Sequence, residues 1–117
     1  MSTSYRSLVV WQRAMEVVEE TYRLTTDYPK HEAFGLARQM QRSSVSIASN
    51  IAEGRYRGSQ KDNNRFLRMA FSSGAELETQ IEISIRIGYV QIQQCESLKT
   101  VLEEVMRMLN KLLSITR

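Results

Sequence analysis

The last quarter of the chain carries an apolar pattern that is typical of a packed α-helix. Its apolar residues recur at steps of three and four positions: Cys95, Leu98, Leu102, Val105, Leu109 and Leu112. This spacing places all of these side chains along one stripe of a helix. Such a stripe is stable only when it is buried, so the rest of the chain has to supply partners for it.

Three earlier segments show the same helical spacing and are the expected partners. Helices are predicted over residues 8–26, 32–53 and 60–87, with the last helix over residues 92–115. Their apolar rows are Leu8, Trp11, Met15, Val18 and Tyr22 beside Val10, Ala14, Val17 and Leu24; then Phe34, Leu36, Met40, Ile47 and Ile51; then Phe66, Ala70, Leu77, Ile81 and Ser84. Gly74 interrupts the third segment, and we expect a close helix contact to compensate for it.

Short connections with turn residues separate the predicted helices. Pro29 ends the first helix, because proline disfavours helical geometry in the residue before it. Gly54 is expected as the left-handed cap of the second helix, and Gly88 as the stop of the third. Ser59 and Asp62 form a capping signal between them. Four helices joined by short turns predict an all-α, antiparallel up-down-up-down four-helix bundle, a single domain spanning residues 1–117.

Composition places the chain among ordinary globular proteins. Apolar residues make up 42% and charged residues 25% of the sequence, far from the signature of disorder. Cys95 is the only cysteine, so no internal disulfide marks an oxidising compartment. Residues 1–6 lack the apolar stretch of a signal peptide, and no apolar run reaches the length needed to cross a bilayer. We therefore expect a cytoplasmic protein that does not span a membrane.

Residue patterns that support catalysis are missing from the sequence. His31 is the only histidine, and it has no cluster of acids or cysteines around it in sequence, so it is a poor metal ligand or catalytic base. Cys95 falls on the apolar stripe and is expected to pack as a small hydrophobic residue. No glycine-rich phosphate loop or dinucleotide motif is present. We expect no enzyme activity, no cofactor, no metal and no small-molecule substrate.

Positive charge is concentrated in the middle of the chain. Residues 33–75 hold seven basic residues, six of them arginines, against Glu53 and Asp62, whereas the flanking segments are each slightly acidic. Arginine suits contact with phosphate, and an exposed tyrosine can stack on a base. The predicted nucleic-acid-binding residues lie around the turn between the second and third helices: Arg55, Tyr56, Arg57, Lys61, Arg65 and Arg68.

A second interpretation of the same charges stays open at the level of sequence. The turn is then merely solvated, and Arg42, Glu53 and Glu76 form a buried or interfacial ion network. Residues predicted to have such structural or interface roles are Arg42, Ser46, Asn50, Glu53 and Glu76. Burial and mutual pairing of Arg38, Arg42 and Glu53 would favour a protein-interaction scaffold, provided that Arg55, Arg57 and Lys61 do not share a face.

Apolar residues outside the inner rows indicate self-association. Ile83, Ile85, Met106, Leu113 and Ile115 do not fall on the rows that fill one bundle core. Apolar surface in excess of a core marks an interaction surface. We therefore predict a homo-oligomer, with Ile83 outside the bundle core.

Several segments resemble a known protein family. The run Ser43-Ser-Val-Ser-Ile-Ala-Ser-Asn-Ile-Ala-Glu-Gly54 is similar to the signature of the bacterial four-helix-bundle proteins encoded within intervening sequences of 23S ribosomal RNA genes. Shorter matches in the same order extend over about residues 8–113: Leu8-Val-Val-Trp11, Tyr22, Tyr28-Pro29, Phe34-Gly-Leu36, Gln39, Arg42, Phe66-Leu67, Met69-Ala70, Ser73 and Glu76-Leu-Glu-Thr-Gln80. Ser72-Ser-Gly74 departs slightly from the pattern.

This resemblance implies a ring-shaped homopentamer with a basic surface. The family is also similar in fold to accessory proteins of diversity-generating retroelements, which bind nucleic acid beside a reverse transcriptase. Fold analogy supports function only weakly. The sequence leads to the hypothesis of a non-enzymatic homo-oligomeric bundle that binds RNA or DNA. The rival hypothesis is a protein-interaction scaffold with no nucleic-acid binding.

Overall fold

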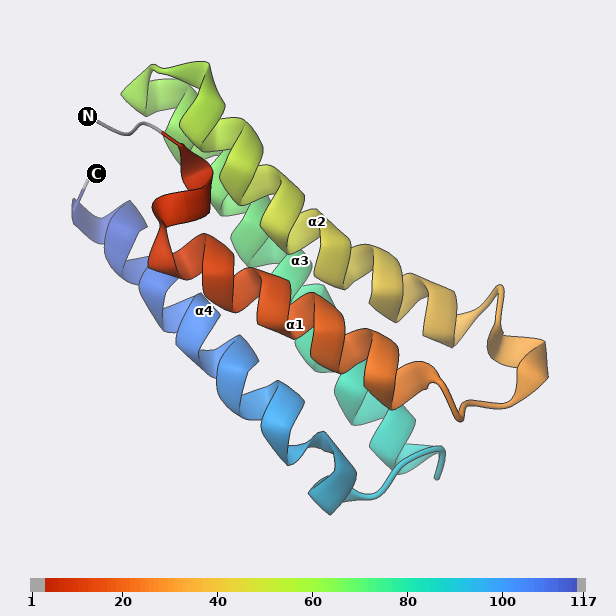
Figure 1. Cartoon of the computed structure of the whole chain (residues 1–117). Helices are drawn as coiled ribbons and strands as arrows, with labels where there is room; N and C mark the ends of the chain where they lie inside the picture. The colour runs from red at the N-terminus through yellow and green to blue at the C-terminus, as the bar shows by residue number, and fades with distance from the viewer. Residues whose placement is uncertain (1–3, 116–117) are drawn as a thin grey trace.

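Four α-helices make up nearly all of residues 4–115, the part of the chain that the computed structural model describes. They are α1 (Val9–Thr25), α2 (Leu36–Arg57), α3 (Gln60–Arg86) and α4 (Glu96–Ile115), and no strand occurs within the described range (Figure 1). Short 3-10 turns precede three of them: η1 (Tyr5–Ser7), η2 (Lys30–Glu32) and η3 (Ile92–Cys95). The all-α prediction is confirmed, and the arrangement is that of a four-helix bundle.

The bundle is long and narrow, with the connections gathered at its two ends. Its principal extents are 45 × 22 × 21 Å. The connection between α2 and α3 lies at the same end as η1 and the last turns of α4 (Figure 1). The other two connections meet at the opposite end, where the rings of Tyr28 and Tyr89 touch edge to face with centroids 5.5 Å apart. We call the first end the tip and define it as residues 4–7 and 53–68.

The core follows the predicted rows of α2, α3 and α4 closely. Met40, Ile47, Leu77, Val105 and Leu109 are completely buried. The mid-helix glycine, Gly74, faces the thioether of Met106 in α4, which confirms the close helix contact expected there. The contact between α2 and α3 is the most extensive in the bundle. No helix among the described residues is long and apolar enough to cross a membrane.

In α1 the buried row is the second of the two predicted rows. Val10, Ala14 and Val17 are buried, and the row continues through Thr21 and Thr25. Both threonine hydroxyls donate hydrogen bonds to backbone carbonyls one turn earlier, at 2.7 Å and 2.9 Å, which satisfies these polar groups inside the core. The other row, from Leu8 to Tyr22, lies at the surface or only partly buried.

The predicted start of the second helix is wrong by four residues. The segment after Pro29 forms η2, and α2 begins at Leu36. Phe34 falls outside the helix and is 89% exposed, so it is not part of the inner row. The carboxylate of Glu32 accepts a hydrogen bond from the Leu36 backbone N–H at 2.8 Å and caps the helix there. A side chain four residues upstream fixes this start, which the apolar spacing does not reveal.

The predicted cap at Gly54 is also wrong. Gly54 lies buried inside α2, which continues to Arg57, and Gly58 takes the left-handed conformation at φ 83°. A β-carbon at position 54 would lie 2.8 Å from the Asn63 side chain, so a glycine is needed there for helix packing. The predicted cap at Ser59 is confirmed, since its hydroxyl accepts a hydrogen bond from the Asp62 N–H at 3.1 Å.

The apolar stripe of α4 shifts at its end. Leu113 is 5% exposed and belongs to the core, whereas Leu112 is 39% exposed. A straight helix drifts by about 20° per heptad relative to a strict seven-residue repeat, so the inward position moves by one residue after two heptads. Leu113 therefore does not belong to the apolar residues left outside the core. Ile85 and Met106 are partly buried and pack against the core. Ile83 is 41% exposed, which confirms its place outside the core.

Candidate nucleic-acid interface

The tip is built by a connection of only two residues between α2 and α3. Gly58 supplies the positive φ that ends α2, and Ser59 caps α3 immediately afterwards. A non-glycine residue adopts this left-handed conformation only at a steric cost. The short connection keeps the last turns of α2 beside the first turns of α3. The exposed side chains of residues 53–57 and 60–68 therefore lie at the same end of the bundle.

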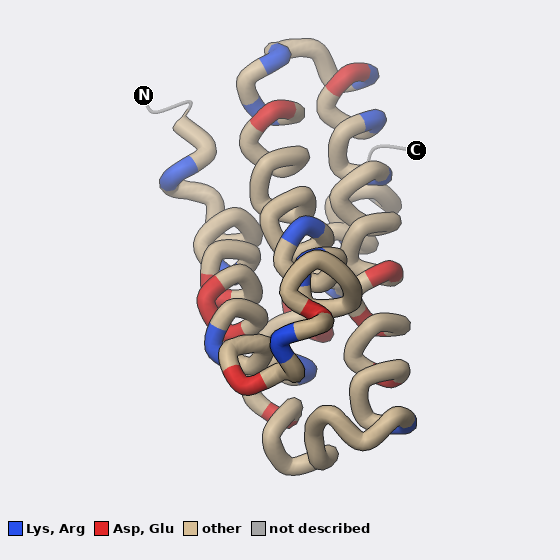
Figure 2. Tube along the Cα trace, turned by 90° about the vertical axis from the view of Figure 1, so that its right-hand side faces the viewer, with Lys and Arg blue, Asp and Glu red and all other residues tan. Residues whose placement is uncertain are grey.

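All six predicted nucleic-acid-binding residues lie on the tip and are exposed. They are Arg55, Tyr56, Arg57, Lys61, Arg65 and Arg68. Figure 2 shows Lys and Arg positions on both sides of the connection, with acidic positions among them. The acidic residues of the tip are Glu53 and Asp62. Tyr56 is 84% exposed although it is aromatic. The structure thus brings the whole predicted set together.

Two of these arginines are held by neighbours within the tip. Arg57 forms an ion pair with Glu53 at 3.1 Å, and Arg65 lies 3.9 Å from Asp62. Both guanidinium groups also lie over the ring of Phe66, at 5.2 Å and 4.7 Å from its centroid. Their charge is partly offset by the carboxylates. Lys61 and Arg68 have no ion pair with any residue in the described range.

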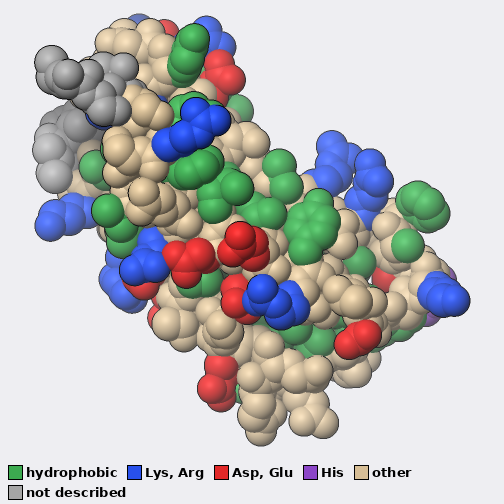
Figure 3. All heavy atoms as spheres, viewed as in Figure 1, with side chains coloured by type: hydrophobic (Ala, Val, Ile, Leu, Met, Phe, Trp, Pro, Cys, Tyr) green, Lys and Arg blue, Asp and Glu red, His purple; other side chains and the backbone are tan. Residues whose placement is uncertain are grey.

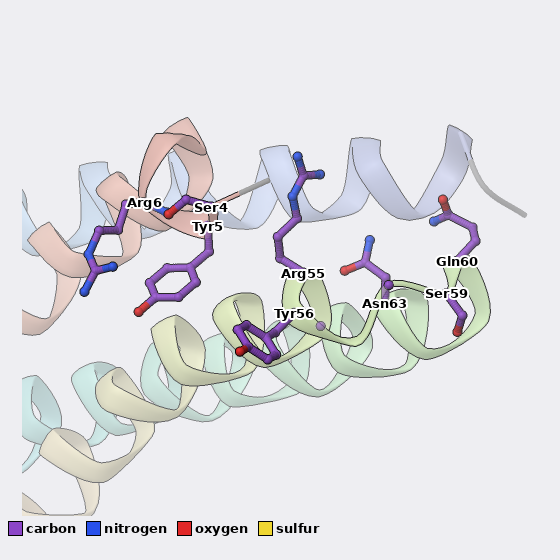
Figure 4. A pocket seen from close by; sticks show the side chains of 10 residues that line it. Ser4, Tyr5, Arg6, Arg55, Tyr56, Ser59, Gln60 and Asn63 are labelled. Atoms are coloured by element: carbon purple, nitrogen blue, oxygen red, sulfur yellow. The ribbon is translucent and has the colours of Figure 1, made fainter. Parts of the chain in front are cut away.

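A hollow of about 850 Å³ opens between the tip's two chain segments. It is lined by Ser4, Tyr5, Arg6, Gly54, Arg55, Tyr56, Gly58, Ser59, Gln60 and Asn63. Figure 4 shows Tyr5 and Arg6 coming from η1, and Arg55 and Tyr56 from the end of α2. The hollow therefore combines two guanidinium groups with two phenol rings.

The wall formed by η1 was not predicted from the sequence. Ser4 and Gln12 hold it in place: the Ser4 hydroxyl accepts from the Arg6 N–H at 3.1 Å, and the Gln12 amide donates to the Arg6 carbonyl at 2.9 Å. Tyr5 packs edge to face on Trp11, with centroids 5.2 Å apart. Tyr5 and Arg6 are about 50 positions from Arg55 in the chain. Only the fold brings Tyr5 and Arg6 close to Arg55. A tyrosine next to an arginine was the one sequence signal that could have marked them as binding residues.

The predicted structural residues separate into a small polar cluster and exposed charges. The hydroxyls of Ser46 in α2 and Ser73 in α3 are 2.8 Å apart, and the Asn50 amide donates to the Ser46 carbonyl at 2.8 Å. The contact between Ser46 and Ser73 joins α2 to α3, whereas the Asn50 bond lies within α2. A structural or interface role for Ser46 and Asn50 stays a prediction.

The predicted buried ion network does not exist within one chain. The residues Arg42, Glu53 and Glu76 are all exposed, and Glu53 pairs with Arg57 instead. Arg38 is exposed as well. Long charged side chains near a helix surface keep their charge in water when no partner encloses them. An interfacial network between copies stays a prediction.

Other ionisable groups lie at the end opposite the tip. Glu32 accepts hydrogen bonds from the Leu36 N–H and from the Tyr89 hydroxyl, the latter at 2.7 Å. These two bonds lower the pKa of Glu32, and the bond to Glu32 raises the pKa of Tyr89. The exposed His31 ring lies 3.3 Å from the same hydroxyl. Within residues 4–115, no three His, Cys, Asp or Glu side chains are grouped to hold a metal.

Comparison with known proteins places the chain in a family. Its structure is similar to that of a protein of unknown function from the S23 ribosomal protein family of Bacteroides thetaiotaomicron VPI-5482, with a TM-score of 0.80 and 26% sequence identity. The match covers 90% of this chain and 98% of that one. No curated protein matches the sequence. Residues 6–111 match the model of the 23S rRNA-intervening sequence protein family, so the chain belongs to that family.

Proposed function

We propose that this protein is a non-enzymatic, homo-oligomeric four-helix bundle that binds RNA or other nucleic acid through its tip and acts in the cytoplasm. The observation that carries the proposal is the charge of the tip. Its cations, Arg6, Arg55, Arg57, Lys61, Arg65 and Arg68, outnumber the two carboxylates of Glu53 and Asp62. A surface of this kind suits a phosphate backbone, which several exposed cations contact at once.

Salt dependence tests the nucleic-acid part of the proposal. Affinity for an RNA pool should fall steeply as salt rises, because each neutralised phosphate releases counterions. Lys61→Gln and Arg68→Gln should each reduce the slope of log affinity against log salt by about 0.7 to 0.9 for a lost contact. Arg86→Gln, at the far end of α3, is the matched control and should leave the slope unchanged. Absence of binding at low salt would favour the protein-interaction scaffold instead.

Assembly is the second part of the proposal, and two unlike apolar faces support it. On α1 the row Leu8, Trp11, Met15, Val18 and Tyr22 follows heptad spacing outside the core, and Val45 of α2 extends it. Figure 3 shows hydrophobic side chains gathered along the boundary between α1 and α2. On α3, Met69 and Ile83 are exposed, with Glu76 midway between them on the same helical row.

The two faces differ in charge as well as position. Arg38 and Arg42 border the face of α1 and α2, whereas Glu76 lies within the face of α3. We propose that the face of α1 and α2 in one copy contacts the face of α3 in the next copy. We also propose that the four helices of each copy run in an antiparallel up-down-up-down order. A contact between unlike faces closes into a ring when its rotation allows. Our proposed ring contains five copies and repeats the tip five times, which strengthens weak binding by avidity.

Light scattering on a sizing column tests the assembly. Five chains of 13.6 kDa give about 68 kDa. Tyr22→Glu and Ile83→Glu should each yield a helical monomer, because each destroys one of the two faces. A mixture of the two variants should form a one-to-one heterodimer through the remaining intact pair of faces. If Tyr22→Glu is monomeric and Ile83→Glu remains assembled, the contact joins like faces and the proposed pairing is wrong.

A further inference from the structure

The aromatic rings of the hollow are its least expected feature. Tyr56 is 84% exposed and its ring contacts no other ring among residues 4–115. Tyr5 is fixed from behind by Trp11, and the Arg6 guanidinium lies over its ring at 5.2 Å. Neither ring fills the bundle core. An exposed tyrosine beside arginines is the arrangement that stacks on a nucleic-acid base.

Polar groups in the same hollow match the edge of a base. The Asn63 side-chain amide lines the hollow and makes no hydrogen bond within the described part of the chain. An amide supplies one acceptor and two donors in a plane. Such a group reads a base only where the base's hydrogen-bonding edge is free. The Gln60 amide is less suited to contact a base, because it already donates a hydrogen bond to the Asn64 side-chain oxygen at 3.0 Å.

Two cations line the hollow together with the tyrosines. Arg6 comes from η1 and Arg55 from the end of α2, so each wall of the hollow carries one cation (Figure 4). The hollow, at about 850 Å³, is large enough for a base with its sugar and phosphate. A base-paired duplex conceals the base faces and edges that this lining addresses. The chemistry therefore fits nucleotides that are not paired.

We infer that the hollow binds an unpaired nucleotide of a single-stranded or looped segment. The base lies against Tyr5 and Tyr56, the Asn63 amide contacts its edge, and Arg6 and Arg55 contact its phosphate. This inference rests on the proposed function, because it names the form of nucleic acid that the tip takes. It goes further by predicting selectivity, which positive charge alone does not provide.

The chain contains its own reporter for occupation of the hollow. Trp11 is the only tryptophan, and its ring touches Tyr5, which lines the hollow. A base placed against Tyr5 changes the surroundings of Trp11. Tryptophan fluorescence should therefore respond to single-stranded RNA, and should not respond to a ligand that contacts only Lys61 or Arg68.

The experiment titrates the full chain with an unstructured 12-nucleotide RNA and with a 12-base-pair RNA duplex, following fluorescence anisotropy and tryptophan emission. We expect the single strand to bind at least 10-fold more tightly than the duplex at equal salt. Tyr56→Leu should weaken single-strand binding about 5- to 150-fold, the range for loss of one stacked base, and leave duplex binding unchanged. Tyr56→Phe retains the ring and should bind as the natural protein does.

Three results would overturn the inference. If strand and duplex bind with equal affinity and Tyr56→Leu has no effect, the hollow does not bind an unpaired nucleotide. Salt-dependent binding by the tip would still stand in that case. Saturation by adenosine monophosphate at the same concentrations as the 12-nucleotide strand would make the hollow a free-nucleotide site. Absence of binding by either RNA at low salt would overturn the proposed function too. Circular dichroism of Tyr56→Leu checks that loss of binding is not loss of fold.

Discussion

Gly54 of α2 lies so close to Phe66 of α3 that a β-carbon on the glycine would come within 2.9 Å of the Cβ of the phenylalanine. The carbonyl oxygen of Asn63 would lie 3.2 Å from the same β-carbon. Neither neighbour is the free end of a flexible side chain. The two helices therefore meet almost backbone to backbone within the tip.

This contact predicts that Gly54→Ala destabilises the bundle by about 1 to 3 kcal/mol, the usual cost of overpacking a tight contact. Gly74→Ala is the control, since its β-carbon would meet the mobile thioether of Met106. That side chain can move aside, and alanine favours the helix by about 0.5 to 1 kcal/mol over glycine. Urea unfolding followed by circular dichroism measures both changes. Equal stability of Gly54→Ala and the natural protein would contradict the packing described here.

The Glu32 cap predicts a pH dependence of stability. The backbone N–H of Leu36 and the hydroxyl of Tyr89 lower the pKa of Glu32 in the folded protein. A lowered folded pKa gives stability that is present above the unfolded pKa, about 4.3, and lost as pH falls through the folded value. The natural protein should be more stable than Glu32→Gln at pH 7, and the difference should shrink below about pH 4.

Thermal unfolding at several pH values measures this difference. Glu103→Gln, which changes an exposed residue of α4, is the control and should follow the natural protein at every pH. A difference between Glu32→Gln and the natural protein that stays constant down to pH 3 would show that the carboxylate does not act as the cap.

Burial of Cys95 predicts a protected thiol. The side chain is completely buried, and burial raises the pKa of its thiol, so the reactive thiolate is scarce. Iodoacetamide should alkylate Cys95 at least 100-fold more slowly in the native protein than in urea. A Ser97→Cys variant carries an exposed thiol two residues away as an internal comparison. Rapid modification of Cys95 in native buffer would mean that the start of α4 opens readily.

The ion pair between Glu53 and Arg57 predicts that removal of the Glu53 carboxylate raises the affinity of the tip for RNA. Glu53 pairs with Arg57 at 3.1 Å. Glu53→Gln removes a negative charge and frees the guanidinium for a phosphate, so RNA affinity should rise about 3-fold at low salt. Stability should change by less than about 1 kcal/mol, because exposed ion pairs contribute little. Filter binding at two salt concentrations checks the change, and an unchanged or weaker affinity would place Arg57 outside the interface.

Much of the fold was predictable because helical rows encode it directly. The core positions of α3, and those of α4 as far as Leu109, followed from spacing alone, and the cap at Ser59 followed from its sequence signal. The sequence alone did not predict which glycine ends α2, because both Gly54 and Gly58 can end a helix. The close approach of Phe66 to Gly54 decides between them. The same holds for α1, where two adjacent rows are apolar and contact with the other helices decides which one is buried.

The site was predictable where its residues are neighbours in sequence. Arg55 to Arg68 form one charged stretch, so their clustering was visible before folding. Tyr5 and Arg6 reach the hollow only because η1 folds back onto the end of α2. The burial of charges also depends on the fold: Arg42 and Glu76 occupy helical positions that suit an ion network, yet the bundle leaves both at the surface.

The two-residue connection at Gly58 and Ser59 also determines whether the tip or its ligand changes conformation on binding. Helices joined this tightly have no hinge, and the spacing between their cations is set before any ligand arrives. Binding then costs the protein little conformational entropy, and the adjustment falls on the nucleic acid. The tip is in this sense a fixed template, and a flexible RNA loop can adapt to it more easily than a rigid helix can.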